Sequence, residues 1–422
     1  MSLVRRSRRT APAQARRSGP LIAVALVSAV LLALSGCGAS SSSDDQGSAP
    51  VGSADDAQGA GETTAPPKPA VTVTSNIARG AHGVAVDKVV KVSAKNGTVE
   101  DVAVTTGKGA RVAGTVSADR TTWTATQLLE PGTAYTVRAT GVDADGKALT
   151  TKSRFWTKDL TLDEQTYPSV APLNGETVGI GMPVIVTFDV PVTDKANFEK
   201  HMHVDSKPAQ QGSWYWVSDK EAHWRPKTYW KAGTDVSVHV DVNSVAAGGG
   251  IFGQEDRDVS FHVGDAHIYK VNTRTDEMKV FSNGKLLRTI PVTTGKPGFT
   301  TRSGVKVIIE KFAKHTMNSE TIGIGKNNPE YYDMKDVQWA MRMTYSGEFL
   351  HAAPWSVYAQ GHENVSHGCT GMSTADAYWL YQMTRRGDVV ETVGTDRPME
   401  FGNGYGDWNM SFANYKKGSA LA

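Results

Sequence analysis

Short runs of alternating polar and apolar residues, separated by turn signals, dominate residues 70–265 and restrict this region to a β architecture. The run TAYTV at 133–137 is one example. Alternation with a period of two places one face of a strand in a core and the other in solvent. The turn signals include Asn96-Gly97, Pro131-Gly132 and Asp145-Gly146. Many short strands with turns at this spacing predict β-sandwiches.

An internal repeat divides this region into two copies of one module. Trp123, Gly132 and Thr133 recur at an offset of 101 residues as Trp224, Gly233 and Thr234. We therefore predict tandem β-sandwiches over 70–160 and 161–264 that serve as spacers. The second copy carries aromatic residues that could line a glycan-binding face, although aromatic residues in a sandwich more often form the core: Trp214, Tyr215, Trp216, Trp224 and Trp230.

The N-terminal segment has the features of an export signal. Its apolar run, LIAVALVSAVLLAL at 21–34, has 14 residues, which is short for a membrane-spanning helix but typical of a signal peptide. The following residues, LSGC at 34–37, resemble a bacterial lipobox, in which the cysteine is lipidated. We predict a signal peptide over 1–37 and an anchor at Cys37; the alternative is a cleaved signal with an incidental cysteine. Residues 38–69 contain few large apolar side chains and predict a disordered tether.

Composition limits the remaining possibilities. A chain of 422 residues is long enough for several domains, and its net charge of only +2 gives no general field for binding nucleic acid. The chain has two cysteines, Cys37 and Cys369. If Cys37 carries lipid, Cys369 has no disulfide partner, and it is therefore either a buried inert side chain or a reactive thiol.

The last part of the chain predicts a third, mostly β domain over 265–394 and a C-terminal extension over 395–422. Strand-like runs flank the hairpin signal Asn283-Gly284. One main helix is expected after the cysteine, with Ser373 or Thr374 as its N-cap and apolar residues at helical spacing as far as residues 385–386. Gly387 is the expected C-cap.

The neighbourhood of Cys369 indicates a nucleophile. A free thiol is only a few per cent thiolate at neutral pH, so a catalytic cysteine needs a base or a positive neighbour. His351, His362 and His367 all lie within 18 residues of it. Gly368 permits a tight backbone geometry that can direct amide N–H groups towards a developing oxyanion.

His351, followed 16 residues later by His367 in the sequence SHGC at 366–369, resembles the signature of the YkuD-type L,D-transpeptidase domain. The resemblance extends over about 265–393. With its lipobox and two predicted sandwiches, the whole chain is similar to actinobacterial lipoprotein members of this family, which have two N-terminal Ig-like domains. The sequence GDWN at 406–409 resembles the C-terminal extension that these members fold back on the catalytic domain. The expected fold class is thus mainly β, with two Ig-like sandwiches before a catalytic domain.

The resemblance assigns roles to individual residues. It implies that Cys369 is the nucleophile, that His351 is its base and that the backbone carbonyl of Ala352 orients the imidazole. His367 and Gly368 would shape the pocket, with amides around Gly368 and Cys369 forming an oxyanion hole. It implies no metal and no cofactor. The expected substrate contacts are Tyr332 on a covering flap, Ser346, Gly347, Trp355 and Gly371, the last replacing an Asn that is frequent in relatives.

The resemblance also implies a reaction and a location. The thiolate would attack a donor tetrapeptide stem of peptidoglycan, release D-alanine and pass the acyl group to the side-chain amine of an acceptor stem, which makes a 3-3 cross-link. Carbapenem β-lactams would acylate the same thiol. The protein would be lipid-anchored to the cell membrane and would face the periplasm or cell-wall side.

Four alternatives stay open at this point. A cell-wall cysteine peptidase, or L,D-carboxypeptidase, would use the same thiol with water as the acceptor. A zinc hydrolase could use His362, His367 and Cys369 as ligands. The string SNGK at 282–285 matches the Ser-x-x-Lys of serine penicillin-binding enzymes, but it lies on an expected hairpin and lacks a Lys-Thr-Gly partner. The last alternative is a non-catalytic wall-binding scaffold.

Overall fold

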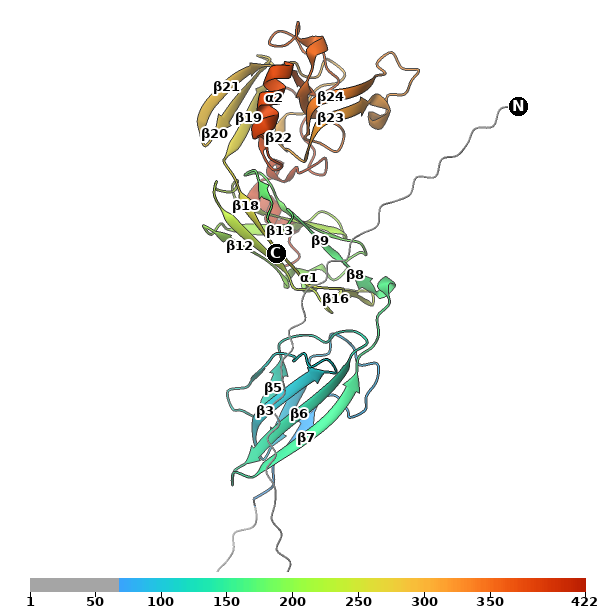
Figure 1. Ribbon diagram of the computed structural model, residues 1–422, viewed down its shortest axis with the longest axis vertical. Helices are drawn as coiled ribbons and strands as arrows, with labels where there is room; N and C mark the ends of the chain where they lie inside the picture. The colour runs from blue at the N-terminus through green and yellow to red at the C-terminus, as the bar shows by residue number, and fades with distance from the viewer. Residues whose placement is uncertain (1–67) are drawn as a thin grey trace, which may run out of the picture. The chain divides into compact units, whose positions relative to one another are not determined.

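The computed structural model of the chain describes residues 68–422, and Figure 1 shows the elements of this part. The predicted signal peptide, the lipidation site Cys37 and all but the last two residues of the predicted tether lie outside the described residues. Within 68–422 the chain forms 27 β-strands and three short α-helices. The predicted mainly β fold class is confirmed.

The first sandwich pairs two antiparallel sheets around an apolar core that includes Trp123, Tyr135 and Phe155. Asn96 and Gly146 have positive φ at two of the predicted turns. One sheet has the order β1 (Thr72–Ser75), β2 (Lys91–Lys95), β5 (Thr122–Ala125), β4 (Gly114–Val116). The other has the order β3 (Gly97–Thr106), β6 (Ala134–Asp143), β7 (Ala148–Trp156).

The second sandwich contains two four-stranded sheets and a small three-stranded one. The first has the order β13 (Gly212–Trp216), β14 (Glu221–Pro226), β11 (Val184–Phe188), β9 (Pro168–Ala171). The second has the order β10 (Thr177–Val178), β18 (Arg257–Val263), β15 (Asp235–Val240), β12 (Met202–Lys207). The third has the order β16 (Ala246–Gly248), β17 (Ile251–Gly253), β8 (Gln165–Thr166). The short elements are η1 (Leu162–Glu164) and α1 (Lys195–Glu199).

The tryptophans of the second sandwich belong to its core. Trp214, Trp216, Trp224 and Trp230 are all buried, and the rings of Trp224 and Trp230 stack with centroids 5.3 Å apart. Because these rings are almost completely enclosed, they mainly provide packing. The structure thus favours the core interpretation of the aromatic cluster.

The third domain has two sheets around the helix α2 (Thr374–Met383). The first sheet has the order β21 (Lys285–Pro291), β20 (Glu277–Ser282), β19 (His267–Asn272), β27 (Val389–Val393), β22 (Gly304–Val307). The second has the order β23 (Glu310–Asn318), β24 (Asp333–Arg342), β25 (Phe349–Ala352), β26 (Thr370–Met372). Two 3₁₀ turns are η2 (Ser319–Ile322) and η3 (Pro354–Ser356).

The structure confirms the hairpin and the helix N-cap predicted for this domain. Asn283 and Gly284 both have positive φ and join β20 to β21, as the hairpin signal predicts. Ser373 caps α2 by accepting a hydrogen bond from the Asp376 amide. The predicted end of the helix was wrong. The helix stops at Met383 because Thr384 is extended, and its amide and hydroxyl both donate to the Leu380 carbonyl.

The C-terminal segment carries η4 (Asp407–Asn409), α3 (Phe412–Tyr415) and η5 (Lys416–Gly418). It was expected to fold back on the third domain, and Asn409 does bond both backbone groups of Val305. Earlier in the segment, Thr395 bonds Ser303 and Glu400 pairs with Arg302 of the third domain. Further along, buried Asp407 bonds His223 of the second sandwich and Trp408 donates to the Gly181 carbonyl. The segment therefore joins the third domain to the second sandwich.

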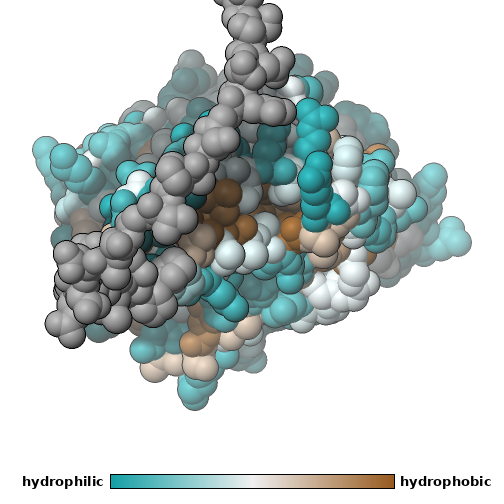
Figure 2. All heavy atoms as spheres, turned by 90° about the horizontal axis from the view of Figure 1, so that it is seen from below, coloured by the Kyte–Doolittle hydropathy of each residue, from teal (hydrophilic) through white to brown (hydrophobic). Residues whose placement is uncertain are grey.

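On the face drawn in Figure 2, hydrophilic residues surround a limited group of hydrophobic ones. Along residues 68–422, no helix combines the length and apolar character needed to cross a membrane.

Candidate active site

Neighbouring parallel strands bring the cysteine and a histidine together. Cys369 immediately precedes β26, which pairs in parallel with β25, and His351 of β25 lies opposite Gly371. Gly368 enters this strand with φ of +120°, a conformation that side-chain-bearing residues rarely adopt. The glycine before the cysteine is thus needed for the backbone direction that aims Cys369 at the adjacent strand.

Cys369 and His351 line one cavity of about 280 Å³. The cavity also contains four of the other residues expected from the sequence: Tyr332, Trp355, His367 and Gly371. Further lining residues were not predicted: Thr293, Met317, Met334, Ala353, Ser356, Tyr358, Val365 and Ser366. The lining is rich in apolar side chains, with a few polar groups close to the thiol.

His351 is buried and has a defined orientation. Its Nδ1 lies 2.8 Å from the Ala352 carbonyl oxygen, so Nδ1 carries the proton and donates it to that oxygen. The Trp355 ring stacks on the imidazole with centroids 5.8 Å apart. Burial lowers the pKa of His351 below its usual value, and the Ala352 carbonyl opposes this shift. A neutral imidazole with Nε2 unprotonated can accept a proton.

The thiol of Cys369 is protonated in its resting environment. Its Sγ donates to the Gly347 carbonyl over 3.5 Å. Burial raises the pKa of Cys369 to about 12, while the backbone N–H of Phe349 opposes the shift. Because His351 is also neutral, the resting pair is a thiol beside an imidazole. The thiol proton therefore has to leave as the sulfur attacks.

The backbone before Cys369 is held by two hydroxyl groups that the sequence interpretation missed. Ser366 Oγ donates to the Cys369 carbonyl over 2.6 Å and accepts from the Gly368 amide over 3.1 Å. Thr301 Oγ1 donates to the Gly368 carbonyl over 2.8 Å. The Gly368 amide was expected to contribute to an oxyanion hole, but in this structure it is occupied by Ser366.

Tyr332 lies on the connection between β23 and β24, and its ring packs on His367 with centroids 5.0 Å apart. Glu330 of the same connection accepts from His367 Nε2 at 2.7 Å and pairs with Lys296 at 2.7 Å. Tyr332, the flap tyrosine expected from the sequence, lines the cavity. This connection is the flap expected over the site, and Glu330 ties it to the loop that carries the cysteine.

Ser346 and Gly347 line a second cavity of about 210 Å³. It shares Met317 and Tyr332 with the first cavity. The second cavity adjoins the nucleophile through Gly347, whose carbonyl accepts from Cys369. Predicted substrate contacts are thus divided between two adjoining spaces.

Gly371 is enclosed too tightly for a larger residue in the present packing. A β-carbon at this position would lie 2.8 Å from Ala353 Cβ and 3.3 Å from Thr293 Cγ2. An asparagine, frequent at this position in relatives, would require the Ala353 strand end to shift. The hydrogen bond that such an asparagine could offer a substrate is absent here.

Two alternative sites can be compared with the structure. His362 does not line the cavity that contains His367 and Cys369. Among residues 68–422, no three His, Cys, Asp or Glu side chains are grouped so that they could hold a metal ion. Ser282 ends β20 and Lys285 begins β21, so the SNGK string spans a hairpin turn and does not begin a helix.

Comparison with known proteins agrees with this geometry. Residues 266–392 match the family described as the L,D-transpeptidase catalytic domain, and residues 81–246 match the bacterial Ig domain. L,D-transpeptidase 2 of Mycobacterium tuberculosis is 36% identical over 356 residues, which cover 83% of this chain and 85% of the relative. This chain belongs to the L,D-transpeptidase family. L,D-transpeptidase 5 of the same species is 32% identical over 363 residues, covering 84% of this chain and 78% of the relative.

Membership of the L,D-transpeptidase family makes the protein an acyltransferase and confirms the resemblance found in the sequence. A solved structure of the L,D-transpeptidase LdtMt1 in complex with imipenem is 36% identical, covers 53% of this chain and 97% of that chain, and has a TM-score of 0.47. In the present chain, Cys369 and His351 line one cavity. Ser366, Thr301 and Glu330 are the supporting residues that only the structure identified.

Proposed function

We propose that this L,D-transpeptidase forms 3-3 cross-links in peptidoglycan through an acyl-enzyme on Cys369. The observation that carries the proposal is that Cys369 and a neutral, oriented His351 line the same cavity. Cysteine nucleophiles are activated by such a base, and the base in turn is oriented by a third group. Here the third group is the main-chain carbonyl of Ala352.

The first half of the reaction acylates the enzyme. Cys369 sulfur attacks the carbonyl carbon of the third residue of a donor tetrapeptide stem, and His351 Nε2 takes the thiol proton. The bond to the terminal D-alanine breaks, and His351 returns the proton to the departing amine. General acid–base assistance of this kind is worth roughly 10²- to 10⁴-fold in rate.

The second half transfers the acyl group. The side-chain amine of an acceptor stem attacks the thioester carbon, His351 accepts a proton from that amine, and the sulfur leaves and regains a proton. The two cavities that share Met317 and Tyr332 offer separate approaches for a donor and an acceptor. If water took the place of the amine, the same intermediate would give an L,D-carboxypeptidase.

The proposed setting is the outer face of the cell membrane. The apolar run at 21–34 and the LSGC sequence at 34–37 support lipidation at Cys37, with residues 38–69 as the link to the folded domains. The partners in this proposal are peptidoglycan stems, the membrane through the lipid anchor, and carbapenems as covalent inhibitors.

Mass spectrometry of the protein and its products tests the function directly. After incubation with purified disaccharide-tetrapeptide, the protein should gain the mass of this substrate minus that of D-alanine, and a dimer with a 3-3 link should accumulate. Cys369→Ala should give neither species. A monomeric tripeptide without dimer would assign the protein as a carboxypeptidase, and no adduct with intact folding would favour the scaffold alternative.

A further inference from the structure

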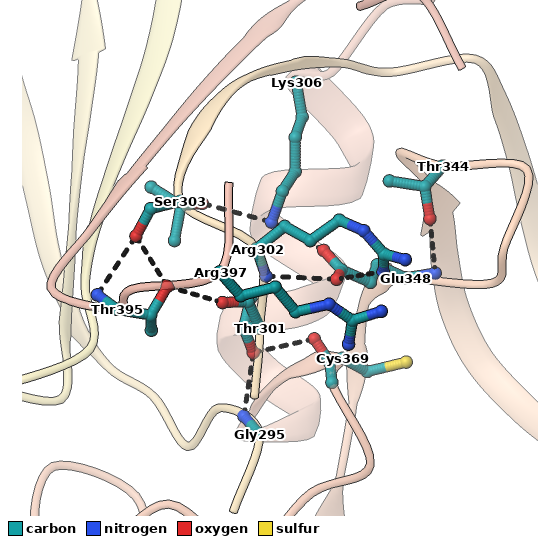
Figure 3. A network of polar contacts seen from close by, with 12 residues as sticks. Gly295, Thr301, Arg302, Ser303, Lys306, Thr344, Glu348, Cys369, Thr395 and Arg397 are labelled. Carbon is teal, nitrogen blue, oxygen red and sulfur yellow. Dashed lines mark hydrogen bonds and ion pairs between the residues drawn. The ribbon is translucent and has the colours of Figure 1, made fainter. Parts of the chain in front are cut away.

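An ion cluster is buried next to the active-site cysteine. Lys306 of β22 is fully buried, and its Nζ lies 2.6 Å from Glu348 Oε2. Arg302 Nη1 lies 2.9 Å from Glu348 Oε1, and the Arg302 amide donates to the same oxygen over 3.1 Å. Figure 3 shows these side chains beside Cys369. Nothing in the acyl-transfer scheme above uses them.

The cluster touches the segment that carries the nucleophile. A β-carbon on Gly368 would lie 3.8 Å from Glu348 Cγ, so the Glu348 side chain borders the space beside Gly368. Glu348 also follows Gly347, whose carbonyl accepts from Cys369, and precedes β25, which carries His351. Glu348 is thus in contact with the nucleophile loop and covalently close to the base strand.

The buried charges do not cancel. Arg302 and Lys306 are both largely enclosed, and Glu348 is the carboxylate buried between them. The other carboxylate paired with Arg302 belongs to Glu400, whose side chain is 52% exposed and therefore screened by solvent. Among the buried side chains of the cluster there are thus two cations, Arg302 and Lys306, for one carboxylate, while the partly exposed Glu400 supplies a second carboxylate to Arg302.

Such an arrangement is costly if packing is its sole purpose. Moving charged groups out of water costs several kcal/mol for each ion, and apolar residues of similar volume often stabilise a protein at least as well. A net positive charge next to a thiol, however, favours the thiolate and the anionic tetrahedral intermediate formed from it.

We propose that Glu348 and Lys306 are positioning residues for the nucleophile. Glu348 holds the Gly368–Cys369 segment in place, and Lys306 supplies buried positive charge behind the sulfur. This inference rests on the proposed function for its use in catalysis. Its physical content, the opposite influence of two buried charges on one thiol, is independent of the substrate.

Other charged or titratable groups reach the thiol from different sides. His351 faces it from β25 and Tyr332 from the flap, while His367 of its own loop is engaged with Glu330, which also pairs with Lys296. After burial itself and the Phe349 amide, the contributions to the pKa of Cys369 come from Glu348, which raises it, and Lys306, which lowers it. The two members of the ion pair therefore act with opposite sign.

The test measures alkylation of Cys369 by iodoacetamide between pH 7 and 10 in the full-length protein, quantified at the Cys369 peptide by mass spectrometry. Lys306→Met should slow alkylation about three- to tenfold at a fixed pH, and Glu348→Gln should accelerate it by a similar factor, because half to one pKa unit changes the thiolate fraction by this amount. The Lys306→Met/Glu348→Gln double variant should lie between the two single variants.

Lys311→Met is the matched control, because Lys311 donates to the Tyr381 carbonyl at the end of α2 and makes no contact with Glu348. It should leave the alkylation profile unchanged. If one single variant does not fold, as judged by circular dichroism, the remaining single and the double variant still isolate the effect of one charge.

The outcomes separate the inference from the proposed function. Opposite changes in the Cys369 alkylation rate of the two single variants support the electrostatic role even if no cross-linked product is ever found. Shifts in the same direction, or no shift in folded variants, would show that the cluster acts through packing alone and would overturn the inference. In that case the acyl-enzyme on Cys369 could still be demonstrated with the tetrapeptide.

Discussion

His351 Nδ1 lies 2.8 Å from the carbonyl oxygen of Ala352, the next residue in the same strand. A main-chain oxygen is therefore the group that orients the imidazole, and the side chain at position 352 is not needed for this contact. Since the carbonyl belongs to β25 itself, the hydrogen bond that orients His351 comes from the main chain, and the Trp355 ring stacks on the imidazole.

The first prediction is that a carbapenem acylates Cys369 and adds the mass of the drug. His351→Ala should slow acylation roughly 10²- to 10⁴-fold, because the thiol would lack its proton acceptor. Cys369→Ser should be almost inert, since a hydroxyl is much harder to deprotonate than a thiol. Intact-protein mass spectrometry over time gives the rates.

Cys369→Ala and EDTA provide the controls for this prediction. The alanine variant should form no adduct, and an adduct that persisted would mean that another residue is the nucleophile. EDTA should leave the wild-type rate unchanged. A loss of acylation after chelation that zinc restores would instead favour the metal-dependent alternative.

The second prediction concerns pH. Burial raises the pKa of Cys369 to about 12 and lowers the pKa of His351 below 6.5, so both shifts extend the range in which the pair is neutral. Acylation by a carbapenem should therefore persist below pH 6.5 and decline only when His351 becomes protonated. Alkylation by iodoacetamide, which requires thiolate, should still be rising at pH 10. An alkylation plateau reached near pH 7 would indicate a preformed thiolate–imidazolium pair and contradict this assignment.

The third prediction is that the C-terminal segment loses part of its stabilising contact at alkaline pH. Burial lowers the pKa of His223, but Asp407 and Glu221 raise it more, to about 9. Because the pKa of His223 is higher in the folded protein than its usual value of 6.5, protonated His223 stabilises the fold fully below pH 6.5. This stabilisation is lost as the pH rises through about 9. This pKa shift corresponds to a contribution of roughly a few kcal/mol to the free energy of unfolding.

Thermal unfolding from pH 6 to 10 measures this effect. Wild-type stability should fall across the interval, whereas His223→Gln should be less stable at pH 6 and nearly independent of pH over the same range. His262→Gln is a suitable control, because His262 pairs with Asp235 at an exposed position where an ion pair contributes little. Parallel pH curves for wild type and His223→Gln would rule out His223 as the source.

The fourth prediction concerns the anchor. Cys37→Ala should move the protein from the membrane fraction to the soluble fraction of cells, because one residue carries the proposed lipid. Cys369→Ala serves as the matched cysteine control and should stay with the membrane. Equal membrane association of Cys37→Ala and wild type would refute lipidation at this position.

Much of the architecture was predictable because its determinants are local. Period-two alternation and turn residues such as Asn283-Gly284 act over a few positions, so they indicated strands and hairpins from the sequence alone. The SHGC motif likewise identified Cys369 and, with its spacing, His351. The end of α2 was missed because it depends on Thr384, whose hydroxyl contacts both Leu380 and Tyr269, the latter distant in sequence.

The sequence by itself determined the β-rich class, the family and the residues capable of acyl-transfer chemistry, since each is encoded in short patterns of residue type. Only the tertiary structure showed that Glu330 holds the flap to His367 and that Ser366 occupies the Gly368 amide. It alone placed Lys306 and Glu348 behind the nucleophile. The Glu330–His367 and Lys306–Glu348 contacts join segments tens of residues apart, and the Ser366 contact depends on a local backbone conformation that residue types do not specify. Charges that look solvated in a sequence acquire a role once the fold removes them from water.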